Sequence, residues 1–314
     1  MSQYEIKRED LVKILARVAN SPSRDINELI DEIDARFYVD RVAESFLFRA
    51  RIGKPNLVTV SLKASIQLQA HSYAYGVLLA AFGNPGFRQM GDAERRKLLE
   101  PADHFLNWAV GQDAQRWLAK RGEQLPDDHI LAVAAARPPD DVLNRLTETQ
   151  LMFCVGLFNY AMTFIILHEI GHLKLHHGAS TPEHEKAADR FAAEWLSDAA
   201  SESKTDIEAN RLVALCGIAV ALLWITTPRV YLGPSSSDSH PEAYDRLWQV
   251  LEHIIETEDE RELVWYFVSN VLFLHIHTAG YEFDDSDLPR MQCPLHEQVN
   301  YLIDRISKQD KKRR

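Results

Sequence analysis

One stretch near the middle of the chain decides the fold prediction: residues 168–196 read HEIGHLKLHHGASTPEHEKAADRFAAEWL. Its first part completes a long apolar run with helical character. Its second part follows Thr181-Pro182, a typical helix start with a threonine N-cap and a proline at the first helical position. The stretch therefore predicts two helices, separated by a break near residues 178–182.

The first of these helices carries the pattern H-E-x-x-H at residues 168–172. Residues four apart share a helix face, so the imidazoles of His168 and His172 can reach one metal ion. Glu169 lies about 100° round the helix from His168. Its carboxylate can there take a proton from a metal-bound water and later return it. Gly171 has no side chain, which would let another backbone pack close to the site.

A third metal ligand is expected on a separate element, because a catalytic zinc ion typically takes three protein ligands and leaves one position for water. The second helix places Glu185 and Asp189 on one face. Glu185 is the predicted ligand, and Asp189 is predicted to accept a hydrogen bond from the distal ring nitrogen of a ligand histidine. His184 competes as third ligand, although it points about 100° away from the face of Asp189. His176 and His177 are expected to be exposed and to interact with the helix C-terminus.

Helical periodicity dominates the rest of the chain, so the expected fold class is mainly α (α+β). Two β-leaning runs at 44–51 and 56–62 flank Gly53-Lys54-Pro55-Asn56 and predict a small antiparallel β-hairpin. The predicted helices cover residues 7–20, 25–38, 63–82, 92–119 and most of the chain from about 141, apart from breaks near 178–182 and 227–241.

Composition and charge limit the classes of protein. The chain has 314 residues and a formal net charge of −11, which argues against a nucleic-acid partner. Cys154, Cys216 and Cys293 are far apart, so they predict no disulfide framework and fit a reducing cytosol. The N-terminus has no apolar signal-peptide core. We therefore expect a cytoplasmic location.

The longest apolar run, residues 151–167, is near the lower limit for a transmembrane helix. It contains Asn159 and continues directly into a charged, histidine-rich segment. We expect a buried core helix and no membrane span, with a membrane-embedded enzyme as the alternative.

The stretch 168–196 resembles the gluzincin metallopeptidases, in which H-E-x-x-H is followed by E-x-x-A-D or a close variant. It is most similar to the Lit-type phage-exclusion peptidases and to the ImmA/IrrE-type peptidases. The resemblance implies a zincin-like core and a Zn²⁺ ion held by His168, His172 and Glu185. It also implies that Glu169 acts as general base in the hydrolysis of peptide bonds of a cytosolic protein substrate.

ImmA/IrrE-type peptidases often carry an N-terminal helix-turn-helix, and none is identified in this sequence. The Lit-like interpretation is therefore favoured over the ImmA/IrrE-like one. The Lit-like interpretation implies a role in bacterial anti-phage defence and an activating trigger protein or peptide. Two alternatives stay open. One is an ImmA/IrrE-like regulatory peptidase that cleaves a repressor, and the other is a non-catalytic helical scaffold stapled by zinc.

A second segment, His240–Arg246 (HPEAYDR), follows the most loop-like part of the chain. By itself it predicts only a helix start with one surface ion pair. It is also similar to an HP-x-x-x-x-R pattern found downstream of the metal site in another group of zinc proteases. That similarity implies that His240 or Arg246 reaches the active site, where either could stabilise the oxyanion.

The predicted domain organisation has three parts. An N-terminal helical segment covers residues 1–43, a zincin-like catalytic domain covers 44–307, and a disordered basic tail covers 308–314.

Overall fold

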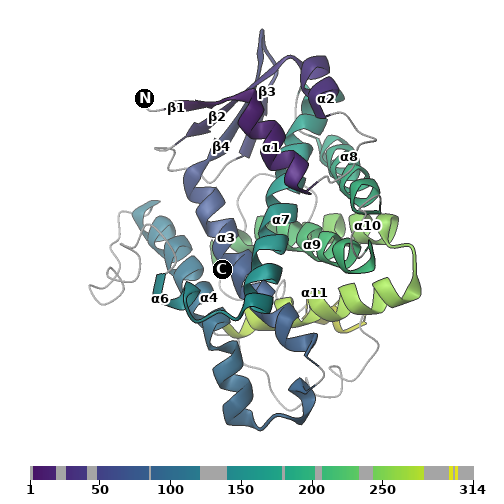
Figure 1. The fold of residues 1–314 in the computed structure, drawn as a ribbon. Helices are drawn as coiled ribbons and strands as arrows, with labels where there is room; N and C mark the ends of the chain where they lie inside the picture. Colours follow the sequence, from purple (N-terminus) through teal and green to yellow (C-terminus); the bar gives the residue numbers. More distant parts are fainter. Residues whose placement is uncertain are drawn as a thin grey trace. The chain divides into compact units, whose positions relative to one another are not determined.

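The chain is mainly helical and carries one four-stranded sheet in the part that the structure describes (Figure 1). This confirms the predicted class, mainly α (α+β). The structure is a computed structural model, and it describes residues 3–18, 26–40, 48–84, 86–120, 140–178, 181–201, 207–232, 243–278, 297–299 and 301–302.

The helices follow the predicted pattern in most places. Helix α8 begins at Pro182, as the Thr181-Pro182 pair predicts. Helix α9 continues to Leu232, so the loop predicted from residue 227 is wrong in its first residues. The helices are α1 (Arg8–Val18), α2 (Ile26–Ile33), α3 (Leu62–Phe82), the short 3₁₀ helix η1 (Phe87–Gln89), α4 (Asp92–Lys120), α6 (Asp140–Leu143), α7 (Glu148–Lys174), α8 (Pro182–Ser201), α9 (Ile207–Leu232), α10 (Ala243–Ile254) and α11 (Glu258–Thr278).

The sheet has the strand order β1-β2-β4-β3, with β1 (Gln3–Ile6), β2 (Ala35–Asp40), β3 (Phe48–Arg51) and β4 (Asn56–Ser61). Strands β3 and β4 form the predicted antiparallel hairpin, in which Ala50 lies opposite Val58. Strand β2 pairs in parallel with β4, so the sheet is mixed. Among the described strands, β3 stands at one end of the sheet order, next to β4 (Figure 1).

The predicted helix over residues 25–38 is wrong in its second half. Helix α2 ends at Ile33, and Asp34 has a positive φ of 42°, a backbone conformation that stops a helix. Strand β2 follows, and Phe37 on it is buried in the core. Strand β1 was not predicted either. The segment 1–43, predicted as helical, therefore supplies two of the four strands.

The chain divides into two compact units. Residues 168–196 belong to the first, and α3, α7 and α9 contribute residues to both. The first unit comprises Met1–Gln69, Gly156–Leu222 and Ser237–Ile254, and the second comprises Ala70–Val155, Leu223–Ser236 and Ile255–Arg314. The predicted tail 308–314 lies outside the described residues.

Helix α7 contains the apolar run that raised the question of a membrane span. Among the described residues it is the one helix that is long and apolar enough to cross a membrane, and 56% of its most apolar window is buried inside the protein. The core helix of a soluble protein passes the same test of length and composition, so this one helix is weak evidence for a membrane span.

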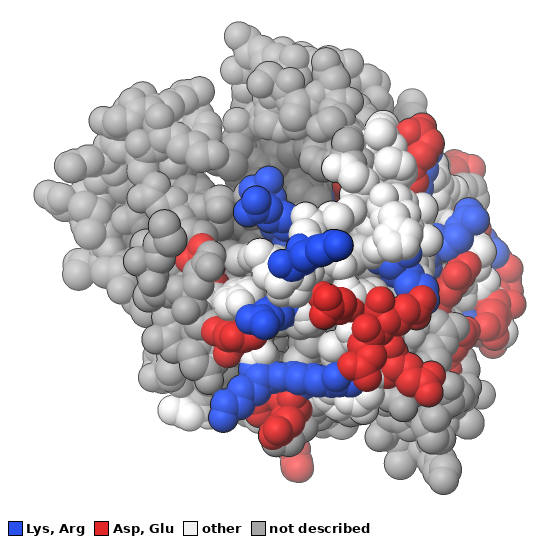
Figure 2. Space-filling view, turned by 90° about the horizontal axis from the view of Figure 1, so that it is seen from above, with Lys and Arg blue, Asp and Glu red and all other residues white. Residues whose placement is uncertain are grey.

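Charge is mixed on the surface. On the face drawn in Figure 2, Lys and Arg side chains lie interspersed with Asp and Glu side chains. The described residues of this face therefore present no continuous basic stripe of the kind that follows a nucleic-acid backbone.

Within the second unit, Gly76 of α3 lies against the backbone of α7. A Cβ atom at this position would be 2.5 Å from both the N and the Cα atoms of Cys154. Because the obstacle is backbone, Gly76→Ala is expected to lower the free energy of unfolding by about 1–3 kcal/mol, despite the better helix propensity of alanine. Urea unfolding measures this. Gly91→Ala is the control, since a Cβ there meets nothing within 4 Å, and equal stability of the two variants would contradict the prediction.

Candidate metal centre

Helix α7 brings two histidines and one glutamate to its C-terminal end. His168 and His172 lie one turn apart, and their Nε2 atoms are 3.1 Å from each other. Helix α8 adds Glu185, whose two carboxylate oxygens each lie 3.4 Å from one of these Nε2 atoms. Among the described residues, these three form the group of side chains that could hold a metal ion.

The distances between these donor atoms fit a small tetrahedral cation. Zinc bonds of about 2.0–2.1 Å place neighbouring ligand atoms of a tetrahedron about 3.3–3.4 Å apart. The two Nε2 atoms are 3.1 Å apart, each lies 3.4 Å from a different carboxylate oxygen of Glu185, and one donor atom from each residue lies within 4.8 Å of the others. Two imidazole nitrogens and a carboxylate are also a donor set that zinc takes in catalytic sites. The residues present therefore fit the ion that the H-E-x-x-H pattern implies.

Gly171 explains how α8 comes close enough to supply the third donor. A Cβ atom at Gly171 would lie 3.2 Å from the Cα atom of Ala188 and 3.1 Å from the Phe191 ring. Both distances are shorter than ordinary van der Waals contact. The missing side chain thus allows α7 and α8 to pack closely, as the sequence predicts, and Glu185 lies less than one turn before Ala188.

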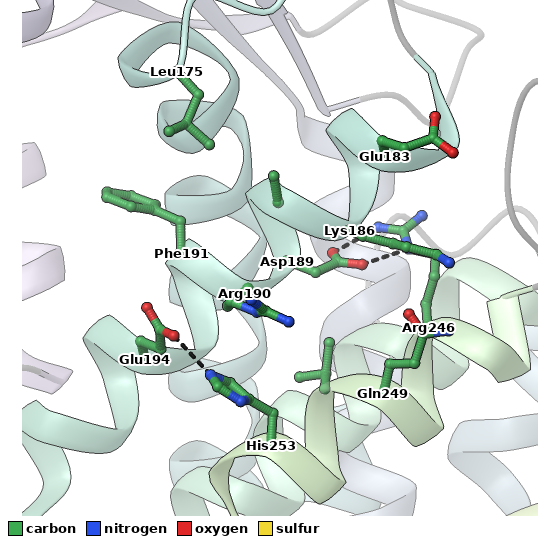
Figure 3. Close-up of a pocket in the computed structure, with 12 residues that line it drawn as sticks. Leu175, Glu183, Lys186, Asp189, Arg190, Phe191, Glu194, Arg246, Gln249 and His253 are labelled. Atoms are coloured by element: carbon green, nitrogen blue, oxygen red, sulfur yellow. Dashed lines mark hydrogen bonds and ion pairs between the residues drawn. The ribbon is translucent and has the colours of Figure 1, made fainter.

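A chain of polar contacts extends behind His168. Its Nδ1 atom lies 2.9 Å from Oδ1 of Asp189, the residue predicted to orient a ligand histidine. Arg246 of α10 donates two hydrogen bonds to Asp189, from Nε at 2.6 Å and from Nη2 at 2.7 Å (Figure 3). Its Nη1 atom also lies 3.5 Å from Glu185. Arg246 thus contacts both Asp189 and Glu185 of α8.

The charges of these contacting residues determine the direction of their pKa shifts. Burial disfavours the charged form of His168, but the carboxylates of Asp189, Glu185 and Glu169 together outweigh it and raise the pKa of His168 to about 9. Burial disfavours the charged form of Asp189 as well. The positive charge of His168 and the hydrogen bonds from Arg246 nevertheless hold the pKa of Asp189 below its usual range. Asp189 is fully buried, so these partners are what keep its carboxylate ionised.

Glu169 lies beside the donor group, as the helical geometry predicts. Its carboxylate is buried, and its Oε2 atom accepts a hydrogen bond from the backbone N–H of Ala50 at 2.5 Å. Burial raises the pKa of Glu169, against the opposing effect of His168 and His172. A proton acceptor with a raised pKa is better matched to proton transfer near neutral pH than an ordinary glutamate.

Two predictions about the other histidines have different outcomes. His177 is not a simple exposed residue: its Nδ1 atom lies 3.1 Å from Nδ1 of His172, and its ring stacks on that of His184 with centroids 4.1 Å apart. Sequence reasoning missed this contact, because the turn that produces it is not a helical spacing. His176 is exposed, as predicted. His240 lies outside the described residues.

A pocket of about 460 Å³ opens between α8 and α10 (Figure 3). Asp189 and Arg246 belong to its wall, whereas none of the three donors does. Figure 3 also shows the ion pair between Glu194 and His253, at 2.7 Å, across the same two helices. The pocket is therefore lined by the residues that support His168 and not by the donor group itself.

Fold and site together define a mainly helical protein with a two-histidine, one-carboxylate donor group beside a buried glutamate. The family model for Peptidase U49 matches residues 86–268, more than half of the chain. The chain therefore belongs to the peptidase U49 family, which supports proteolytic activity in general. No curated protein and no solved structure matches it.

Proposed function

We propose that this peptidase is a zinc-dependent endopeptidase of the gluzincin type. The observation that carries the proposal is the donor group: His168, His172 and Glu185 bring two imidazole nitrogens and a carboxylate close enough together to hold one ion. Three protein donors are the number typical of catalytic zinc sites, whereas structural sites usually have four and are rich in cysteine. A zinc ion that only holds a helical scaffold together would not need a proton acceptor such as Glu169 beside it.

In this proposal, each residue has a separate task. A zinc ion, when bound, polarises the scissile carbonyl and lowers the pKa of water at the site. Glu169 removes a proton from the attacking water and delivers it to the leaving amine. Asp189 holds the ring of His168 in orientation through Nδ1, and Arg246 holds Asp189. We assign Arg246 to this positioning task, because two of its nitrogens are hydrogen-bonded to Asp189.

Strand β3 is the proposed place for an extended substrate. Its Ala50 N–H points to Glu169, so the outer edge of the strand lies beside the proposed general base. An edge strand offers backbone donors and acceptors that a peptide can pair with. We propose that a protein substrate binds along this edge, with its scissile bond near Glu169.

The resemblance to Lit-type peptidases supports a cytosolic protein substrate and a role in anti-phage defence, with an activating trigger protein or peptide. The experiment that tests the function compares cells that express the wild type with cells that express Glu169→Gln. Protein N-termini are enriched and identified by mass spectrometry. New N-termini that appear only with the wild type are expected. Identical sets of N-termini would overturn the proposal, and cleavage of a transcriptional repressor would favour the ImmA/IrrE-like alternative.

The hydrogen bond from Ala50 to Glu169 gives a separate prediction. Ala50→Pro removes this N–H without removing a bond to β4, since the N–H is directed to Glu169 and proline is tolerated at such positions of a strand at the end of a sheet. A hydrogen bond to a charged group contributes about 1.5–3 kcal/mol, so cleavage of the substrate identified above should fall about 10- to 100-fold. Ala50→Gly keeps the N–H and is the control. Equal rates for the two variants would show that the bond is dispensable.

A further inference from the structure

The Nδ1 atoms of the two histidines of the donor group lie next to different side chains. His168 is backed by the buried Asp189, as the sequence predicts for one ligand histidine. His172 lies on the next turn of α7. The residue that faces its Nδ1 atom is His177, with the two Nδ1 atoms 3.1 Å apart.

We infer that His177 is a positioning residue that holds His172 in its metal-binding orientation by accepting a hydrogen bond from Nδ1. The inference rests on the proposed zinc centre. The Nε2 atom of His172 faces His168 and Glu185, so it needs a free lone pair to bind a metal ion. The ring proton of neutral His172 is then on Nδ1, which donates to Nδ1 of His177.

The backbone at the end of α7 brings His177 to this place. The N–H of His177 donates to the carbonyl of His172 at 3.0 Å, and the N–H of His176 donates to that of Leu173 at 3.2 Å. This pair of bonds is a Schellman motif, in which the residue after the helix takes a left-handed conformation. His176 is that residue, with a φ of 55°. The motif reverses the chain direction and so directs the ring of His177 toward that of His172.

The start of α8 fixes the other face of His177. Its ring stacks on His184, with centroids 4.1 Å apart and an angle of 9° between the planes. His184 is itself held in the first turn of α8, where its backbone N–H donates to Oγ1 of the N-cap Thr181 at 3.2 Å. His177 is thus held from two sides, and its acceptor nitrogen is oriented before a metal ion binds.

Zinc affinity measures this role without an activity assay. The dissociation constant of Zn²⁺ is measured for the full chain by competition with a chelator, and the absorption spectrum is recorded with Co²⁺ as the probe. His177→Phe keeps a ring to stack on His184 but has no acceptor. It should weaken zinc binding about 10- to 100-fold, the usual effect of removing a partner of a ligand histidine. It should also alter the Co²⁺ spectrum.

Two further variants separate positioning from general damage. His177→Asn places an amide oxygen near the position of Nδ1 and should restore most of the affinity. His184→Phe keeps the stack and leaves the bond between His172 and His177 intact, so it should bind zinc like the wild type. Circular dichroism of each metal-free variant shows whether the fold is retained.

The outcomes separate this inference from the proposed function. If the wild type binds zinc and His177→Phe binds it equally well, the positioning role is overturned while the metal centre stands. The same conclusion follows if His184→Phe loses affinity and His177→Phe does not. If the wild type binds no Zn²⁺, the proposed metal centre fails and the role of His177 fails with it.

Discussion

Glu169→Gln is expected to keep its zinc and to lose peptide hydrolysis by about 10²- to 10⁴-fold, the usual contribution of a general acid–base group. The amide has nearly the shape of the carboxylate, so the buried position next to Ala50 stays filled. It cannot take a proton from water at neutral pH, which removes the proposed proton transfer. Zinc content is measured by elemental analysis, and hydrolysis is measured on the substrate found by N-terminal proteomics.

The matched control is Glu183→Gln, which makes the same chemical change on an exposed residue of the first turn of α8. This residue is outside the donor group, so the control should keep both zinc and activity. Full activity of Glu169→Gln would overturn the assignment of the general base. Loss of zinc from Glu169→Gln would show instead that Glu169 contributes to metal binding.

The second large effect is expected for Arg246→Leu. Arg246 and Asp189 are both buried, with exposed fractions of 4% and 0%. Removing the guanidinium leaves the carboxylate of Asp189 buried with His168 as its remaining charged partner at close range. Breaking a buried pair in this way costs about 3–5 kcal/mol, so the free energy of unfolding should fall by that amount. Urea unfolding of the metal-free protein measures it without the added effect of zinc binding.

A control for this prediction lies on the same two helices. Glu194 of α8 and His253 of α10 form an ion pair whose side chains are 47% and 40% exposed. Exposed ion pairs contribute about 0–1 kcal/mol, so Glu194→Gln should change stability little. The variant Arg246→Leu combined with Asp189→Asn should recover part of the loss, because no unpaired buried charge remains. A loss no larger than that of Glu194→Gln would contradict a buried, charged pair at this position.

Local spacing accounts for the parts of the fold and site that could be predicted. His168 and His172 are one helical turn apart, so the helix alone places their rings together. The Thr181-Pro182 pair marks the start of α8, and the break before it is short. The hairpin of β3 and β4 is also local, because it depends on two β-leaning runs joined by a turn.

Long-range strand pairing and an uncommon local backbone conformation account for the parts that could not be predicted. Residues 35–40 follow α2 directly, and their β conformation depends on parallel pairing with β4, more than ten residues further along the chain. The contact between His172 and His177 depends on the left-handed conformation of His176, which residues other than glycine adopt infrequently. Neither feature is visible in a helical or alternating pattern.

The sequence by itself determined the mainly helical class, the two histidines and the glutamate on one helix, and the nitrogen and oxygen donors of a site with no nearby cysteine. These features depend on residue type and on spacing within one element. Only the tertiary structure decided which groups surround that helix. The Ala50 N–H and Arg246 reach the site from β3 and α10. Their positions depend on packing between elements far apart in the chain, including the close approach at Gly171, and no periodicity in the sequence encodes such packing.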